Sequence, residues 1–507
     1  MAIGKTKPLQ EIKEQMANAA SYSEWAELAK RHDELSGMTR WKSREHSNEY
    51  DSSEVSLRLQ RLRQLLGNQD IHGLLFTLNE GIHGNMGGMG NPVLYNRAKF
   101  GTKDLINDYI DALAEAITRV INDDHKIAIE EKLDFLHRAS HCFGRSALML
   151  SGAGNFGHFH VGVAKTLLDN NLLPNVISGS SAGALIAGCL GTNDEASVHK
   201  LLNIDVYFSD LDQPNSEQSL SSRLLFGKQS WVDLDYLEDV LSLFVQDLTF
   251  AEAFELTGRA INISVSPQEE HQTPRLLNAI TAPNVLVRSA VRASCAVPGA
   301  FPAVNLEAKA ENGDRIPYLP SRKWIDGSVV GDLPAKRLAR LYGVNHFIVS
   351  QANPLVLWAR NDPKTSHGLR ANLVRFATKA TKEGFNTGYR MSRKHLKKHP
   401  NLRYAANMVF SVLNQEYSGD INVYPKFRFF DPRMLLKQLT QKEAFALAKN
   451  GERAIWPKLE MIRNCMRLST ILDEGLAHFG NDYNETAVPK VIYKQKRTKT
   501  DSDSNAA

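Results

Sequence analysis

Several features are scarce in this chain, and each scarcity excludes a class of protein. The 507 residues include only four cysteines, which stand far apart at Cys142, Cys189, Cys295 and Cys465. No CxxC pair or Cys/His cluster predicts a metal site, and no dense cysteine framework predicts a secreted disulfide scaffold. We therefore expect buried thiols in a reducing compartment.

Long apolar runs are missing as well. No stretch of about 18 apolar residues predicts a membrane-spanning helix, and the first residues, MAIGKTKPLQEIKEQ, lack the apolar core of a signal peptide. Neither sign of charge is in great excess, since the net charge is +5 with 23% charged and 42% hydrophobic residues. This composition is typical of a soluble globular protein and does not indicate nucleic-acid binding. We expect an intracellular, cytoplasmic protein.

The apolar pattern divides the chain into regions. Residues 1–143 are predicted to be mainly helical, because apolar residues recur three and four apart. Residues 144–350 alternate short apolar runs with glycine turns and helices, whereas residues 351–480 are again helical and are basic in part. Residues 481–507 form a polar tail that we expect to be disordered. The glycine-rich stretch 81–92 lacks the Gly-Lys-Ser/Thr ending of a phosphate-binding loop, which favours a structural loop.

A strand–turn–helix pattern surrounds one serine within the second of these regions, at residues 176–185. Gly179 and Gly183 flank Ser181 at the spacing that a nucleophile elbow requires, with Ser180 as the filler residue. Such a turn exposes the hydroxyl, and the amides at the start of the following helix favour negative charge. Taken alone, the pentapeptide leaves an elbow and a purely structural turn equally open.

A second glycine turn precedes this elbow. A strand predicted over residues 146–151 runs into the glycine loop 152–157, and a helix is predicted over 158–169. Both turns therefore end adjacent strands of a parallel α/β sheet, at the edge where ligands bind. The Gly-x-Gly-x-x-Gly spacing also matches a dinucleotide fingerprint, but no acidic residue ends the second strand. We favour the loop as a source of backbone amides for an oxyanion.

A third segment supplies a carboxylate. Residues 323–328 read as a strand that ends at Asp326-Gly327, after a small-residue helix predicted over Ala290–Phe301 and stopped by Pro298. An Asp-Gly pair is usually only a turn. In a sheet that already carries an elbow serine, it is also a candidate general base.

Together, these segments resemble the patatin-like phospholipase family in the order and spacing of their motifs. The helical region before them, especially GTKDLINDYI at 101–110, resembles the extension of the triacylglycerol-lipase branch of that family. The resemblance implies a Ser181–Asp326 dyad that works without histidine. It also implies an oxyanion hole formed by Gly152, Ala153 and Gly154.

The other motif positions include two departures from the family pattern. Asn155 stands where many members carry Arg or Lys, so we expect weaker electrostatic support for an oxyanion there. Ser328 stands where Gly or Ala is frequent, a small change that we expect to be tolerated. The remaining supporting residues keep the pattern: Gly157, Gly179, Gly183 and Gly327.

The resemblance implies a patatin-like α/β core flanked by helical regions, and a serine lipid acyl hydrolase that needs no metal or other cofactor. His158 and His160 invite a Ser–His reading, but the implied direct Asp base makes them ordinary helix and supporting residues. A lysolipid transacylase, a non-catalytic lipid-surface protein and a nucleotide-binding protein are the alternatives. The substrate would be a glycerolipid, and neither triacylglycerol nor phospholipid is favoured.

A basic segment follows the core. Between Arg360 and Arg403 there are twelve Lys or Arg residues and only two acids, with apolar residues interleaved. This pattern is typical of a solvated helix face, and it also fits docking on an anionic membrane or lipid-droplet surface.

Overall fold

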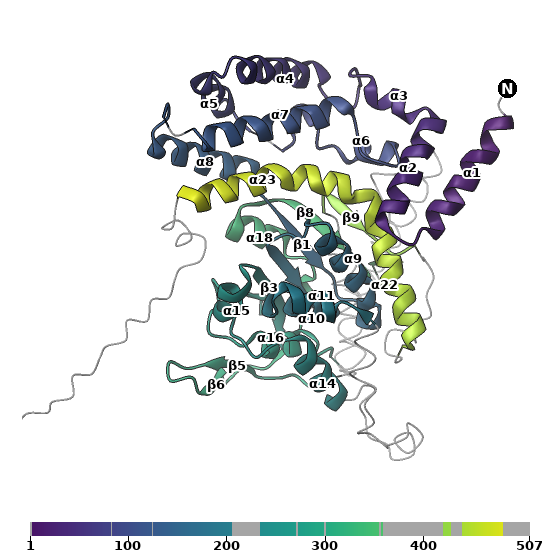
Figure 1. Cartoon of the computed structure of the whole chain (residues 1–507). Helices are drawn as coiled ribbons and strands as arrows, with labels where there is room; N and C mark the ends of the chain where they lie inside the picture. The colour runs from purple at the N-terminus through teal and green to yellow at the C-terminus, as the bar shows by residue number, and fades with distance from the viewer. Residues whose placement is uncertain are drawn as a thin grey trace, which may run out of the picture.

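The computed structural model describes residues 3–82, 84–123, 125–204, 234–269, 272–298, 301–353, 356–357, 419–426 and 439–479. A layer of N-terminal helices covers a long C-terminal helix, which in turn packs on a mixed sheet with helices on its faces (Figure 1). The predicted basic segment and the polar tail lie outside the described residues.

The N-terminal region is helical, which confirms the prediction from its apolar spacing. Helix α7 is its most buried element, with apolar side chains inward along almost its whole length. Asp51, in the loop before α4, caps that helix by accepting hydrogen bonds from the amides of Ser53 and Glu54. The helices are α1 (Ile3–Asn18), α2 (Tyr22–Ser36), α3 (Met38–Ser43), α4 (Ser52–Gly67), α5 (Ile71–Asn79), α6 (Pro92–Arg97), α7 (Asp104–Ile121) and α8 (Ile129–Phe143).

The core is a seven-stranded sheet with the order β4-β3-β2-β1-β8-β9, in which β7 also pairs with β3. Strands β1, β2, β3, β8 and β9 are parallel, which confirms the predicted parallel α/β sheet, whereas β4 and β7 run antiparallel to β3. The strands are β1 (Arg145–Leu150), β2 (Val176–Gly179), β3 (Ala260–Pro267), β4 (Arg275–Leu277), β7 (Trp324–Asp326), β8 (Val344–Ser350) and β9 (Ile421–Val423).

The pairing of β3 fixes where β7 lies. Ile263 pairs with Leu277 of β4 on one edge and with Gly179 of β2 on the other. Val265, two residues later, still pairs with β4 but has Asp326 of β7 on its other edge. Strand β7 therefore occupies the edge of β3 just beyond the end of β2.

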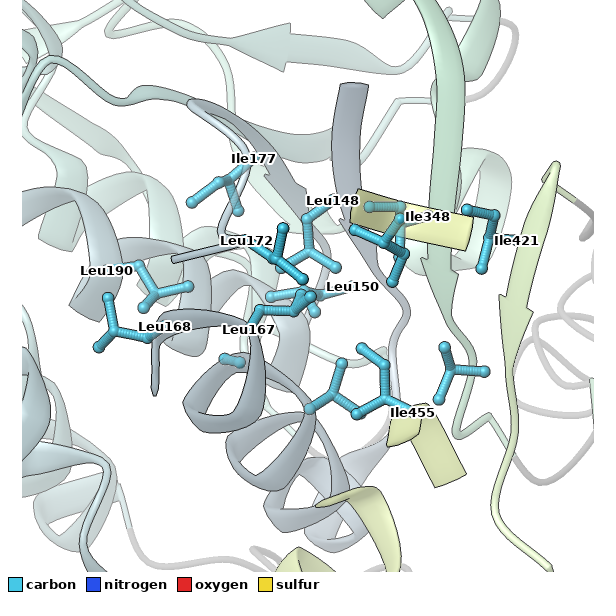
Figure 2. Packing of buried hydrophobic residues seen from close by; sticks show 14 of the residues in the cluster. Leu148, Leu150, Leu167, Leu168, Leu172, Ile177, Leu190, Ile348, Ile421 and Ile455 are labelled. Atoms are coloured by element: carbon cyan, nitrogen blue, oxygen red, sulfur yellow. The ribbon is translucent and has the colours of Figure 1, made fainter. Parts of the chain in front are cut away.

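The main core lies between the sheet and three helices, α9 (His158–Asp169), α10 (Ala182–Thr192) and α22 (Gln441–Ile455). Figure 2 shows Leu148 and Leu150 of β1 together with Ile348 of β8, Leu167 of α9 and Ile455 of α22. Alternate strand residues point the other way and pack on α18 (Ala335–Tyr342).

Helices α9 and α22 approach each other at two glycines. A Cβ on Gly162 would collide with the backbone carbonyl of Ala448, and a Cβ on Gly451 would collide with that of Phe159. Only glycine allows this contact between the two backbones.

Helix α23 (Leu459–Phe479) joins the N-terminal helices to the sheet, because it contacts α7, α8 and β1. Arg145 at the start of β1 forms a bidentate ion pair with Asp473 of this helix, with nitrogen–oxygen distances of 2.8–3.2 Å. Asn464 donates to the side chain of Asn107 in α7 at 3.0 Å. The N-terminal region and the core thus share one packed helix.

The remaining described elements complete the layer around the sheet. The hairpin β5–β6 pairs Leu306 with Tyr318 at its open end. These elements are η1 (Met86–Gly88), η2 (Gly154–Gly157), α11 (Glu195–Leu201), α14 (Leu234–Phe244), α15 (Phe250–Thr257), α16 (Val287–Ser294), β5 (Leu306–Lys309), β6 (Arg315–Tyr318), α17 (Ser328–Gly331) and η4 (Trp456–Lys458). Among the described residues, no helix has the length and apolar character needed to cross a bilayer.

Three local predictions were wrong. The helix expected over Ala290–Phe301 is α16, which ends at Ser294, before Pro298. Strand β9 lies in a region predicted to be helical, because three residues are too few to show a strand pattern. Cys142 is exposed, and Cys295 and Cys465 are only partly buried, although all three were expected to be buried thiols; Cys189 is buried as expected.

Candidate active site

The turn after β2 has the shape of an elbow. Ser181 has φ 52° and ψ −123°, a positive φ that is costly for a residue with a side chain. A Cβ on Gly179 would collide with the carbonyl of Gly183, and a Cβ on Gly183 would collide with that of Leu150. The two glycines of the pentapeptide are therefore required by close packing of the backbone, and the residue between them carries the strain.

Neighbouring groups hold Ser181 in this conformation. Its N–H donates to the hydroxyl of Ser294 at 2.9 Å, and that hydroxyl donates to the carbonyl of Ser264 in β3 at 2.8 Å. The thiol of Cys295 lies 3.5 Å from the Ser181 carbonyl oxygen. Ser294 thus links the elbow to the sheet, a role that no motif in the sequence indicated.

Asp326 is the last residue of β7 and is almost completely buried. Its carboxylate accepts a hydrogen bond from the Ser328 N–H at 2.7 Å. Burial raises the pKa of Asp326 to about 6, whereas the neighbouring Ser328 and the Ser181 side chain lower it. The following Gly327 is packed so closely on the Ser264 carbonyl that a Cβ would collide with it.

The glycine loop lies against both the elbow and the turn after β7. A Cβ on Gly152 would be 2.7 Å from Cβ of Ser328 and 3.6 Å from Cβ of Ser181. Gly154 has φ +53° and is exposed, which favours glycine there. Within the described part of the chain, the amides of Ala153 and Gly154 have no hydrogen-bond acceptor.

The Gly152 amide is different, because it donates to the carboxylate of Asp332 at 2.7 Å. The same oxygen accepts a hydrogen bond from the hydroxyl of Ser180, the filler residue of the elbow. Asp332 is almost completely buried, and burial raises its pKa to about 7. Sequence reasoning missed both Asp332 and Ser180, since residues 152 positions apart form the bond.

The supporting positions lie around the loop. Gly157 packs on the elbow helix, where an added Cβ would be 2.8 Å from Cβ of Ala182. Asn155 is half-buried, and its backbone carbonyl accepts a hydrogen bond from Nδ1 of His158 at 3.1 Å. Burial lowers the pKa of His158.

Both ring nitrogens of His160 are used in holding the fold. Nε2 donates to the Ser151 carbonyl at 3.0 Å, so Nδ1 accepts from the hydroxyl of Ser350 at 2.7 Å. Burial lowers the pKa of His160 to about 4, which keeps the ring neutral. His160 therefore ties the ends of β1 and β8 to α9. Among the described residues, no group of three His, Cys, Asp or Glu side chains could hold a metal ion.

Parts of the sequence match two known protein families. Residues 148–339 match patatin-like phospholipases, and residues 3–141 match a domain of unknown function, DUF3336. "Triacylglycerol lipase ptl3" of Schizosaccharomyces pombe is 33% identical over 471 residues, which cover 90% of this chain and 94% of that protein. The chain belongs to the patatin-like phospholipase family.

Other relatives are longer. "Triacylglycerol lipase 4" of Saccharomyces cerevisiae is 35% identical over 92% of this chain, but the chain spans only 52% of the length of that protein. Among solved structures, VipD from Legionella pneumophila aligns with 65% of this chain and 67% of its own, at 14% identity and a TM-score of 0.30. The family assignment depends on the sequence relatives alone.

Proposed function

We propose that this chain is a serine hydrolase that cleaves carboxylic esters of glycerolipids. The observation that carries the proposal is that the Ser181 side chain lies near the buried carboxylate of Asp326 and lowers its pKa. Ser181 also has the strained backbone of an elbow, at the N-terminus of a helix. The relatives named triacylglycerol lipases support a lipid ester as the substrate.

The mechanism needs only residues of this chain. Asp326 takes the proton of the Ser181 hydroxyl while the oxygen attacks the ester carbonyl, and the carbonyl oxygen becomes an oxyanion. The amides of Ala153 and Gly154 stabilise that oxyanion. Asp326 returns the proton to the departing alcohol, which leaves an acyl group on Ser181. Water, activated by Asp326 in the same way, then releases the fatty acid and restores the hydroxyl.

A pKa near 6 suits Asp326 for this role. A carboxylate with an ordinary pKa would be ionised but weakly basic, whereas one raised by burial is still ionised at neutral pH and accepts a proton more readily. Asn155 brings no positive charge, so the oxyanion depends on backbone amides.

The substrate is held in a lipid surface, so the enzyme would act while associated with a membrane or lipid droplet. Segment 360–403, with its excess of basic residues, is the candidate for contact with anionic lipid. A lysolipid transacylase is a second candidate function, because the same acyl-enzyme can pass its acyl group to a lysolipid instead of to water.

Labelling with a fluorophosphonate probe tests the proposal, because such probes react with activated serines. We expect covalent labelling at Ser181 that Ser181→Ala abolishes. We also expect released fatty acid from mixed triacylglycerol and phospholipid emulsions, and lipid-class profiling would identify the preferred ester. A folded wild-type chain that neither reacts with the probe nor releases fatty acid would overturn the proposal, and acyl-lysolipid formation without fatty acid would favour the transacylase.

A further inference from the structure

A second buried carboxylate lies beneath the candidate site. Asp332 follows Asp326 by six residues, just after the short helix α17. One of its oxygens, Oδ1, accepts hydrogen bonds from the Gly152 N–H and from the Ser180 hydroxyl. The first donor belongs to the glycine loop and the second to the elbow, so one atom links the two turns.

These contacts restrict the loop and the elbow together. The Ser180 hydroxyl also bonds to the backbone carbonyl of Asp332 at 3.3 Å. The Ser180 amide donates to the carbonyl of Leu150, the last residue of β1 before the loop. Hydrogen bonds to a carboxylate are stronger than those between neutral groups, and here they form where water is excluded.

The direction of the Gly152 N–H has a further consequence. This amide points toward Asp332, so it does not donate to an oxyanion while the bond lasts. The next two amides, those of Ala153 and Gly154, have no acceptor within the described residues. The bond that holds the Gly152 amide toward Asp332 therefore restricts the orientation of the Ala153 and Gly154 peptide groups.

We propose that Asp332 is a positioning residue, which holds the Gly152 amide and the Ser180 hydroxyl so that the Ala153 and Gly154 amides are presented to the oxyanion at Ser181. The inference rests on the proposed function of Ser181. The oxyanion hole then consists of two loop amides, without the Gly152 amide. The side chain at position 332 must therefore provide an oxygen that accepts both hydrogen bonds.

Substitutions at 332 separate the acceptor from the rest of the side chain. Asp332→Asn keeps an acceptor at Oδ1, whereas Asp332→Ala removes it. Ser180→Ala removes only one of the two donors and leaves the Gly152 bond, so it serves as the milder variant should Asp332→Ala fail to fold. The full chain is used for all variants.

The first readout needs no activity. Amide hydrogen exchange of a peptide covering residues 148–160 should be faster in Asp332→Ala than in wild type, and unchanged in Asp332→Asn. Equal exchange in all three proteins would overturn the inference, whether or not the chain is a hydrolase.

The second readout is the split between kcat and KM on a short-chain ester. Loss of one oxyanion donor typically lowers kcat by about 10²–10³-fold, so we expect about a 10²-fold loss in Asp332→Ala with little change of KM. Asp332→Asn should retain kcat within about 10-fold, and Ser180→Ala should fall between the two. Wild-type kcat in Asp332→Ala, or an equal loss in Asp332→Asn, would contradict the inference. An inactive wild-type chain would instead refute the proposed function.

Discussion

Asp326 lies on the edge of β3 just beyond the end of β2, where the Ser181 side chain lowers the pKa of its buried carboxyl group. Val265 follows Ile263 by two positions on β3, and Ser181 follows Gly179 by two positions after β2. Strand register, rather than a long loop, therefore brings the two side chains together. Sheet pairing of this kind holds a dyad rigidly before substrate binds.

The pH dependence of catalysis should follow Asp326. Burial raises its pKa to about 6, and the base must be ionised to accept the Ser181 proton. We therefore expect kcat/KM on a soluble ester to fall as the pH drops below about 6, and to level off above about 7. Measurement from about pH 4.5 to about 8.5 on wild type, with Ser181→Ala as the background rate, checks this. A profile that stays flat down to about pH 4.5 would mean that another group is the base.

Stability should depend on the same carboxyl group. Its folded pKa lies above the ordinary value of 3.8, so the folded state binds the proton more tightly than the unfolded state. Stability from this group is therefore greatest at low pH and is lost as the pH rises through about 6. Asp326→Asn should raise Tm by a few degrees near pH 8, and should change it little near pH 4.5.

A matched control shows whether a change of Tm comes from removing a buried carboxylate or from removing any negative charge. Glu311 is exposed on a turn of the β5–β6 hairpin, and Glu311→Gln should leave Tm unchanged at both pH values. Differential scanning calorimetry gives both results. A lower Tm for Asp326→Asn near pH 8 would show that the carboxylate stabilises the fold, contrary to its raised pKa.

The contact between α9 and α22 predicts a large effect from small substitutions. Gly162→Ala and Gly451→Ala each place a methyl group against a backbone carbonyl of the other helix. Overpacking of this kind costs about 1–3 kcal/mol or more, so both variants should unfold at lower temperature or urea concentration. Gly67→Ala is the control, because no atom lies within 4 Å of its added Cβ. Equal stability of all three variants would show that the helices can separate without cost.

The basic segment makes a prediction about lipid surfaces. Reversing the charge at four of its residues should weaken binding to anionic vesicles, with each basic residue contributing about 1 kcal/mol at low salt. Vesicle flotation measures this, and neutral vesicles are the control. The four positions are Arg393, Lys394, Lys397 and Lys398. Unchanged binding to anionic vesicles would exclude the segment as a docking element.

The parts of the site that sequence reasoning located are those with local steric demands. Gly179 and Gly183 are fixed by a turn whose backbone atoms leave no room for a side chain, and such demands appear as spacing. Strands β1 and β2 are short apolar runs between turns, and helix α9 begins and ends where its pattern predicted. Asp326 was recognised by resemblance, because an Asp-Gly pair alone indicates only a turn.

The parts that were missed depend on contacts between distant segments. Ser180 and Asp332 are ordinary polar residues in the sequence, and only the packing of the elbow on the turn after β7 makes them partners. Ser294 is the last residue of α16, and its hydroxyl bridges Ser181 and Ser264. The small-residue pattern continues for several residues beyond it, so the sequence pattern did not show where the helix ends.

The central claim is that Asp326, and not a histidine, activates Ser181. Turnover of a short-chain ester by Asp326→Asn and by His158→Ala, compared with wild type and Ser181→Ala in folded protein, tests it most directly. We predict that Asp326→Asn loses about 10³-fold or more in kcat and approaches the Ser181→Ala background. We predict that His158→Ala keeps most of its activity. Loss of turnover in His158→Ala, with Asp326→Asn still active, would contradict the dyad.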